Sequence, residues 1–157
     1  MANEYQGRTI DILTYQDSAA SHPTRMIPVL AAQNQSGQIC TGVRKLAQRF
    51  LIEFLTAKGS MPYQPLRGTV FMVKASQGYL RTVADVRSAF AEAMIDMYEN
   101  LTKAELGTEP DDERYAGAEL TAVTAQLGSI SLSINLYSKA GTTRTVILPI
   151  STSLGRN

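Results

Sequence analysis

The feature that most constrains this chain is an amphipathic stretch followed at once by a segment that cannot continue as a helix. Between residues 43 and 55 the apolar side chains recur at intervals of three and four, the spacing of one face of an α-helix. Gly59 is a natural stop for that helix, and Pro62 and Pro65 then hold the chain extended. The sequence therefore predicts a helix packed on a core, followed by a rigid loop. The apolar stripe consists of Val43, Leu46, Ala47, Phe50, Leu51, Phe54 and Leu55.

Polar residues fill the opposite side of this predicted helix, where they are expected to meet solvent. Thr41 precedes the first apolar position and is a candidate N-cap, because a threonine hydroxyl can accept from a free backbone N–H. The polar side consists of Arg44, Lys45, Gln48, Arg49 and Glu53.

A second helix is predicted from Thr82, where Thr82 and Asp85 have the spacing of a capping box. Three carboxylates, Glu92, Asp96 and Glu99, lie away from its apolar stripe and are interpreted as a solvated face, with Glu99 spaced to pair with Lys103. The expected buried stripe is Val83, Val86, Phe90, Ala93, Met94, Met97 and Leu101.

The C-terminal third changes to the period of β-strands, with predicted strands at 119–126, 129–138 and 143–151. The middle one alternates Ile and Leu with Ser, Asn and Tyr, which indicates one wet face and one face against helices. Two more strands are expected at 9–15 and 68–74. The predicted class is α+β: two amphipathic helices packed on a mainly antiparallel sheet that ends in a three-strand meander.

The predicted organisation is an N-terminal arm over residues 1–40, with a short strand and a connecting loop, and a single wedge-like α+β domain over 41–157. A chain of 157 residues suits one domain with a real core. No apolar run approaches the roughly 20 residues of a membrane span, and the N-terminus lacks the layout of a signal peptide. We therefore expect a protein made and folded in a cytoplasm.

The formal net charge of +1 argues against a dedicated nucleic-acid binder or a polybasic membrane-surface protein. The charge is nevertheless uneven, because residues 1–81 carry a net +5 and residues 82–157 a net −4. Chance is one explanation. The other is a polarised surface that meets a copy of the chain or a complementary neighbour.

The chain offers little chemistry for catalysis. His22 is its one histidine and Cys40 its one cysteine, and nothing in the sequence positions them as a nucleophile and base, so a structural cysteine is the preferred interpretation. The acidic segment at 109–114 lacks the spacing of a calcium loop, and no glycine-rich phosphate loop follows a strand. The sequence therefore predicts no enzyme, no cofactor and no metal site.

Two segments have the character of interfaces. In the loop after the first helix, Pro65 limits the entropy lost on binding, and Tyr63 and Arg67 are residue types enriched at binding hot spots. The alternative is an ordinary rigid connector.

The second segment is the last predicted strand, with Arg144, Val146, Leu148 and Pro149 as candidate interface residues. Proline cannot donate to a ladder, so Pro149 places this strand at a sheet edge or at its end. Strand addition by a partner would cover that edge, and a local loop or the N-terminal segment is the alternative cover.

The helix and the loop together resemble the opening signature of the lysozyme-like baseplate wedge proteins of contractile phage tails, a family that includes sheath initiators and relatives in type VI secretion. The resemblance extends over about residues 41–150. The family often carries a Glu-Pro-Arg core between its second helix and its sheet. Here Glu109 and Pro110 are followed by Asp111, so either Arg114 takes the place of the arginine or the core motif is absent. The matching positions are Leu46, Phe50, Leu51, Phe54, Leu55, Thr56, Gly59, Pro62, Pro65, Gly68 and Thr69.

The resemblance implies a structural subunit of a tail baseplate, located in the virion and assembled in the host cytoplasm. Such a subunit surrounds the tube and docks the first sheath subunits by strand addition. Its implied partners are tail sheath and tube proteins, other baseplate subunits and copies of itself in a sixfold ring, with no nucleic acid and no membrane. Another virion tail protein, such as a tail-completion, terminator or tube-associated protein, is the alternative, and a small enzyme ranks below both.

Overall fold

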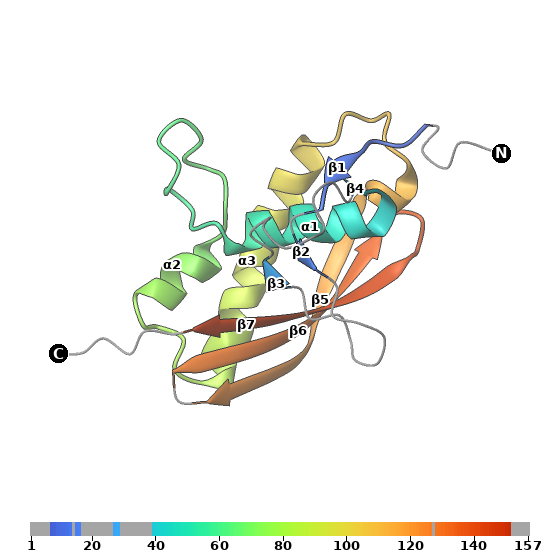
Figure 1. Ribbon diagram of the computed structural model, residues 1–157. Helices are drawn as coiled ribbons and strands as arrows, with labels where there is room; N and C mark the ends of the chain where they lie inside the picture. The colour runs from blue at the N-terminus through green and yellow to red at the C-terminus, as the bar shows by residue number, and fades with distance from the viewer. Residues whose placement is uncertain (1–6, 14, 17–26, 29–38, 127, 152–157) are drawn as a thin grey trace.

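The computed structural model describes residues 7–13, 15–16, 27–28, 39–126 and 128–151. Three helices precede an antiparallel three-stranded sheet in the described part of the chain, which confirms the α+β class (Figure 1). The helices are α1 (Gly42–Leu55), α2 (Val70–Ser76) and α3 (Val83–Lys103), and a short 3-10 turn, η1, covers Asp111–Glu113. The sheet strands are β5 (Tyr115–Gln126), β6 (Ser129–Ser138) and β7 (Thr143–Ser151).

The described N-terminal residues form only two-residue strands. Strand β1 (Asp11–Ile12) pairs with β4 (Ile39–Cys40), and β2 (Tyr15–Gln16) pairs with β3 (Ile27–Pro28), both antiparallel. The strand expected over 9–15 is therefore reduced to β1 and the start of β2. Most of the expected 16–41 connection, with His22, lies outside the described residues.

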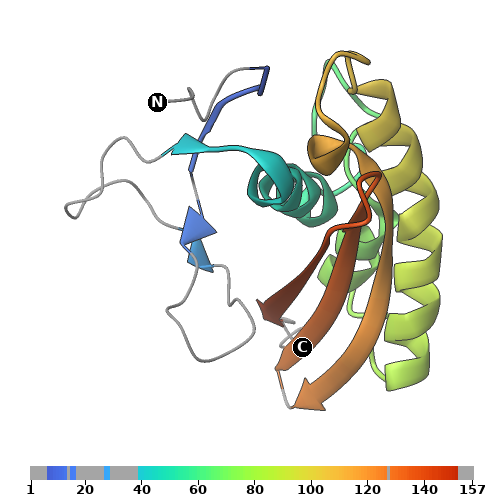
Figure 2. The same cartoon turned by 90° about the vertical axis from the view of Figure 1, so that its right-hand side faces the viewer.

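The meander has the strand order β5-β6-β7, so β6 is central. The alternation predicted for β6 is confirmed, because its Ile and Leu side chains are buried and its Ser, Asn and Tyr side chains on the other face stay half-exposed. Strand β5 begins at Tyr115, earlier than expected, and its register against β6 shifts at two places. Figure 2 shows α3 running along the β5 side of the sheet, with α1 nearer β7.

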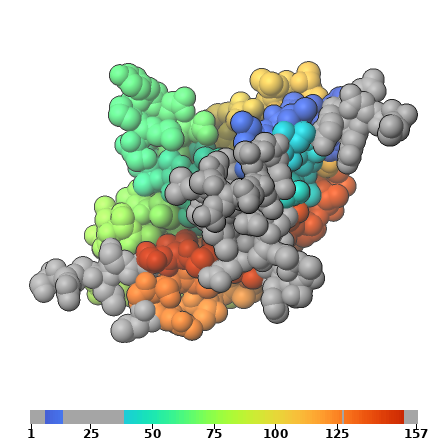
Figure 3. Space-filling model, viewed as in Figure 1, coloured from blue at the N-terminus to red at the C-terminus, as the bar shows by residue number. Residues whose placement is uncertain are grey.

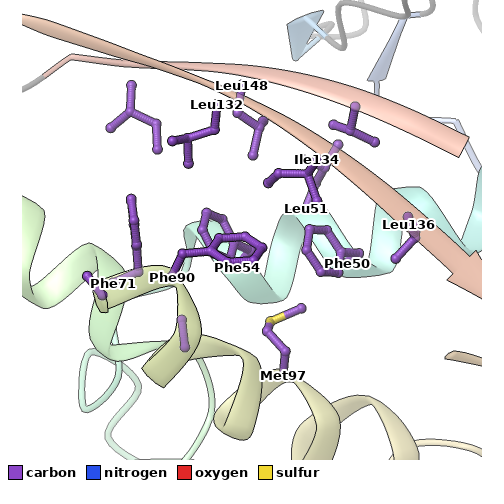
Figure 4. Close-up of a cluster of buried hydrophobic side chains, with 14 of the residues drawn as sticks. Phe50, Leu51, Phe54, Phe71, Phe90, Met97, Leu132, Ile134, Leu136 and Leu148 are labelled. Atoms are coloured by element: carbon purple, nitrogen blue, oxygen red, sulfur yellow. The ribbon is translucent and has the colours of Figure 1, made fainter. Parts of the chain in front are cut away.

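The core lies between the inner face of the sheet and the helices. In Figure 4, Phe50 and Phe54 of α1 form a middle layer. Strand residues such as Leu132 lie on one side of it, and Met97 of α3 lies on the other. Phe54 is the central aromatic, with its ring centroid 4.9 Å from that of Phe71 and 5.8 Å from that of Phe90. Each fully buried side chain of this size contributes about 1.5–3 kcal/mol. This core fixes α1, α2 and α3 relative to one another.

Residues 68–74 do not form the predicted strand, because the chain forms α2 there. Phe71 and Ala75 are buried and lie one helical turn apart, so a two-residue stripe on a short helix faces the core. A run of Val, Phe, Met and Val is compatible with either structure, since it is too short for periodicity to decide.

One residue of the buried stripe predicted for α3 is wrong. Val83 is 41% exposed at the start of the helix.

Two residues assigned to the polar side of α1 are buried instead. Gln48 is 1% exposed and Glu53 is 2% exposed. The Gln48 amide donates to Asp11 Oδ2 and to the Ile12 carbonyl, both at 2.9 Å, and so fastens β1 to the helix. The solvent-facing interpretation was wrong because distant segments supply the polar partners that burial requires.

Candidate interaction surfaces

A loop spanning residues 57–69, here called the 57–69 loop, stands clear of the body between α1 and α2 (Figures 1 and 3). Its two ends are joined by a parallel bridge between Ala57 and Thr69. Backbone bonds close this neck, from Thr69 N to Thr56 O at 2.8 Å and from Lys58 N to Thr69 O at 3.1 Å. The Thr69 hydroxyl also donates to the Phe54 carbonyl at 2.9 Å. The loop is therefore held by its neck and presents its tip to solvent.

A buried carboxylate anchors the loop to α1. Glu53 Oε1 accepts from the Gly68 N–H at 2.7 Å, and Glu53 Oε2 accepts from Arg67 Nε at 2.8 Å and lies 2.6 Å from Arg67 Nη2. The Glu53 side chain is 3% exposed, whereas that of Arg67 is 42% exposed. The structure therefore uses Arg67 as an internal clamp and leaves part of its guanidinium at the surface.

The neck also explains Gly68. Its φ is +86°, in the left-handed region, and a Cβ there would lie 2.4 Å from the Thr56 carbonyl oxygen. Glycine is thus required both for backbone conformation and for the close approach of the two chain segments. This position belongs to the sequence signature quoted above, and its structural role is to close the loop.

The tip of the loop exposes apolar side chains on this fixed frame. Tyr63 is 97% exposed and Leu66 is 70% exposed. Residues 63–67 and the C-terminal end of α3 border a groove of about 470 Å³. The Asn100 amide of α3 donates to the Leu66 carbonyl at 3.2 Å, so the groove wall is tied to the helix. Of the predicted interface residues, Tyr63 and Pro65 are at the exposed tip.

Asp96, predicted to be solvated, also supports this region. Its Oδ1 lies 2.5 Å from Lys58 Nζ, and its Oδ2 accepts from the Val70 N–H at 3.2 Å, at the start of α2. The Asp96 side chain is 13% exposed. A carboxylate at this helix N-terminus satisfies a backbone donor that would otherwise lack a partner. The expected ion pair of Glu99 with Lys103 is present at 3.2 Å.

Strand β7 pairs with β6 alone among the described strands, so it is an edge strand as Pro149 predicted. Val146 and Leu148 are 0% and 4% exposed and belong to the core, so their side chains are not available to a partner. Arg144 lies half-buried opposite Leu136 on the same face. A partner strand could therefore pair with the backbone of β7 but not contact the side chains of Val146 and Leu148.

Pro149 indicates which backbone groups of β7 face away from β6, toward the edge at which no described strand pairs. Because proline has no N–H, the ladder with β6 is kept intact when the Pro149 nitrogen faces away from β6. Backbone groups alternate in direction along a strand, so Thr145 and Ile147 direct their N–H and C=O groups to the same open edge. Ile147 also places its side chain on the outer face, opposite Ser133.

Arg114 lies where the chain enters the sheet. Its guanidinium is 3.3 Å from both Glu105 Oε2 and Asp111 Oδ1. Glu105 also accepts from the Tyr115 N–H and from Lys139 Nζ, both at 2.8 Å. Burial alone would raise the pKa of Glu105, but the hydrogen bonds from Lys139, Tyr115 and Arg114 outweigh it and hold this pKa below its ordinary value. Glu105 therefore ties together the end of α3, the start of β5 and the β6–β7 turn.

Some of the unevenly distributed charges form ion pairs between the two halves of the chain. Among the described residues, five ion pairs join the basic first half to the acidic second half, at N–O distances from 2.5 to 3.8 Å. A large share of this uneven charge is therefore neutralised within the chain. The pairs are Arg8–Asp112, Lys45–Glu113, Arg49–Glu109, Lys58–Asp96 and Lys74–Glu92.

Glu113 is a buried residue that sequence reasoning missed. It is 0% exposed, and its Oε1 accepts from the Gly42 N–H, the first of α1, at 3.1 Å. Its Oε2 accepts from the Thr9 hydroxyl and lies 3.6 Å from Lys45 Nζ. The η1 turn thus supplies the N-terminal cap of α1 in place of Thr41, whose side chain makes no capping bond.

Cys40 has a structural setting. It is 2% exposed, its thiol lies 3.9 Å from Gln48 Oε1, and burial, followed by the nearby charge of Asp11, raises its pKa. Residues 7–13, 15–16, 27–28, 39–126 and 128–151 contain no cluster of His, Cys, Asp and Glu suited to hold a metal ion. None of the helices described here combines the length and apolar character needed to cross a membrane.

No protein-family model, curated protein or solved structure matches this chain.

Proposed function

We propose that this protein is a structural subunit of a contractile phage tail baseplate, a sheath initiator or wedge protein that surrounds the tube and docks the first sheath subunits. The observation that carries the proposal is the open edge of β7, which ends an antiparallel sheet and has one paired neighbour among the described strands. An arm of a sheath subunit would add to this edge through the outward backbone groups of Thr145 and Ile147.

The edge suits a partner strand because its inward side chains already belong to a core. Val146 and Leu148 hold β7 against the helices, so the strand is in place before a partner arrives. Pro149, exposed and without an N–H, limits pairing toward the end of the edge. A partner strand therefore meets a preformed template and loses little additional entropy on the side of this protein.

The 57–69 loop supports the proposal as a second contact, against tube or baseplate neighbours. A docking element needs exposed aromatic or apolar side chains on a frame whose shape is set in advance. Tyr63 and Leu66 supply the side chains, and the clamp between Glu53 and Arg67 supplies the frame. Sixfold symmetry of the tail would repeat both contacts around the tube.

Quantitative mass spectrometry of purified tailed particles from the source tests the proposal. The expected result is a low multiple of six copies of this chain per particle, far below the sheath protein and close to other baseplate subunits. Absence from the particle would refute it. A copy number fitting a ring at the head-proximal end of the tail, with cross-links only to completion proteins, would replace it by the tail-completion alternative.

A further inference from the structure

The outer face of α3 carries a second stripe, of small side chains and the exposed Ile95 and Tyr98, that the core does not use. Six residues of this face are spaced alternately by four and three positions, the repeat of a coiled-coil seam. Five are exposed and the last is half-exposed, with Ile95 at 66% and Tyr98 at 57%. We call this stripe the α3 seam; its members are Ala84, Ser88, Ala91, Ile95, Tyr98 and Thr102.

The α3 seam lies opposite the side of the helix that is buried. The core-facing residues, such as Val86, Ala93 and Met97, occupy the other side of α3. In Figure 2, α3 lies at the right-hand side of the molecule, with the sheet and α1 to its left. From Ala84 to Thr102 the seam is about 27 Å long at 1.5 Å per residue. It is long enough to accept a helix along its length.

The sizes of the seam residues identify the occupant. The N-terminal half of the seam is small, with Ala84, Ser88 and Ala91, whereas the next two positions are the large Ile95 and Tyr98. We propose that the α3 seam binds the α3 seam of a second copy of this chain, with the two helices antiparallel.

Reversal matches large side chains with small ones. It places Tyr98 opposite Ser88 of the second copy and Ile95 opposite Ala91 of the second copy, and the two-fold axis repeats both contacts. Cores pack well when large and small residues alternate across facing positions. A parallel pair would instead set Tyr98 against Tyr98 and leave a gap between the alanines. Both arrangements can have two-fold symmetry, and the antiparallel one is the one in which large residues meet small ones.

One flank of the seam is mainly acidic, and the antiparallel arrangement adds an opposite-charge contact at each end of it. One flank carries Asp85, Glu92 and Glu99, and two of these are already paired, Glu92 with Lys74 at 2.6 Å and Glu99 with Lys103 at 3.2 Å. Reversal brings Lys103 of one copy within about one helical turn of Asp85 of the second copy. Opposed macrodipoles add to this pairing. Reversal also brings Glu92 of both copies near the two-fold axis, where each carboxylate keeps its own ion pair with Lys74.

The inference does not rest on the proposed function. Strand β7 lies on the other side of the molecule from the outer face of α3 in Figure 2, so a dimer through the α3 seam leaves the β7 edge open. Failure of the dimer would leave the baseplate proposal intact, and failure of the baseplate proposal would leave the dimer intact.

A size-swap experiment tests the register. The mass of the purified full chain is measured by light scattering after gel filtration, from about 1 to about 100 μM, the range of modest interfaces. Ser88→Tyr sets two tyrosines against each other and is expected to weaken the dimer by about tenfold or more. The double variant Ser88→Tyr with Tyr98→Ser restores large against small and should recover most of the affinity. Tyr63→Ser, remote from the seam, is the matched control.

A cross-linking experiment tests the direction. Glu92→Cys lies close to its own copy across the antiparallel two-fold axis and is expected to form an interchain disulfide under mild oxidation. Ala84→Cys lies about 27 Å from its counterpart and is expected to stay reduced. Circular dichroism confirms that each variant is folded.

Three results would each overturn the inference. They are a monomer at every concentration, a dimer indifferent to the size swap, and cross-linking through Ala84→Cys instead of Glu92→Cys.

Discussion

The 57–69 loop and strand β7 are the two candidate contact regions, and they are held in opposite ways. The loop has an apolar tip and a polar anchor, because Glu53 fixes its neck through Gly68 and Arg67. Strand β7 has an apolar anchor and a polar edge, because Val146 and Leu148 hold it in the core while its backbone faces outward. The loop therefore offers side chains to a partner and the strand offers backbone. Substitutions should separate fold from binding at different positions in the two regions.

The largest expected loss of stability comes from a substitution that removes the apolar anchor of β7. Val146→Lys puts a cation into the core beside Ile134 and should cost about 4 kcal/mol or more of unfolding free energy. Ile147→Lys, one residue along and on the outer face, should cost less than about 1 kcal/mol. Urea denaturation measures both. Similar costs for the two variants would contradict the inward assignment of Val146.

The next effect breaks the neck of the loop. Gly68→Ala places a methyl group against the Thr56 carbonyl and strains a left-handed residue, at an expected cost of about 2–3 kcal/mol. Gly59→Ala has the same φ of +86° with open space around the Cβ, so only the conformational cost of about 1–2 kcal/mol remains. The difference between their urea midpoints measures the cost of the contact between the methyl group and the Thr56 carbonyl. Equal midpoints would show that this contact costs nothing.

A pH series sharpens the comparison on the sheet side. The pKa of Glu105 is lowered in the folded protein, so its carboxylate adds stability above its ordinary pKa of 4.5 and loses that contribution as the pH falls through the folded value. Glu105→Gln should cost about 2 kcal/mol at pH 7 and less in acid. Thermal unfolding between pH 7 and pH 3 measures the gap to wild type. A gap that is constant with pH would show that the charge of Glu105 is not what stabilises the sheet end.

The smallest effect on stability belongs to the loop tip. Tyr63→Ala removes a side chain that is 97% exposed and should change the unfolding free energy by less than about 0.5 kcal/mol. The same variant should reduce incorporation into tails, because the aromatic contact is lost while the frame stays. Gln77→Ala, at an exposed position outside the 57–69 loop, is its control. Full incorporation of the Tyr63 variant would reduce the loop to a connector.

The sequence predicted the elements whose pattern is long enough to carry a period. Helices α1 and α3 and strands β6 and β7 each repeat their apolar spacing several times. Helix α2 has seven residues and two buried ones, so its stretch could be assigned to a strand equally well. Its true start depends on Asp96 and on the neck at Thr69, both supplied by tertiary structure.

The anchors of both surfaces were harder to predict than the surfaces themselves. Tyr63 and Pro149 were recognisable from residue type and position. Glu53 and Glu113 were not, because a carboxylate on a helix or in an acidic segment normally indicates solvent exposure, and only the fold brings the donors of Gly68 and Gly42 to them. For β7 the sequence identified the edge. In the structure the Val146 side chain is buried, so the backbone of the strand is the candidate contact instead.

Sheath recruitment by an edge-blocked variant tests the central claim most directly. Ile147→Pro removes an outward N–H without removing a ladder bond to β6, and Ile147→Thr keeps that N–H on a β-branched residue as control. Both proteins, verified as folded by thermal melts, are supplied to tails that lack this subunit, and electron microscopy scores the fraction of tubes carrying sheath. We expect the threonine variant to recruit sheath and the proline variant to leave the tubes bare. Normal sheath on tubes assembled with the proline variant would contradict strand addition at β7.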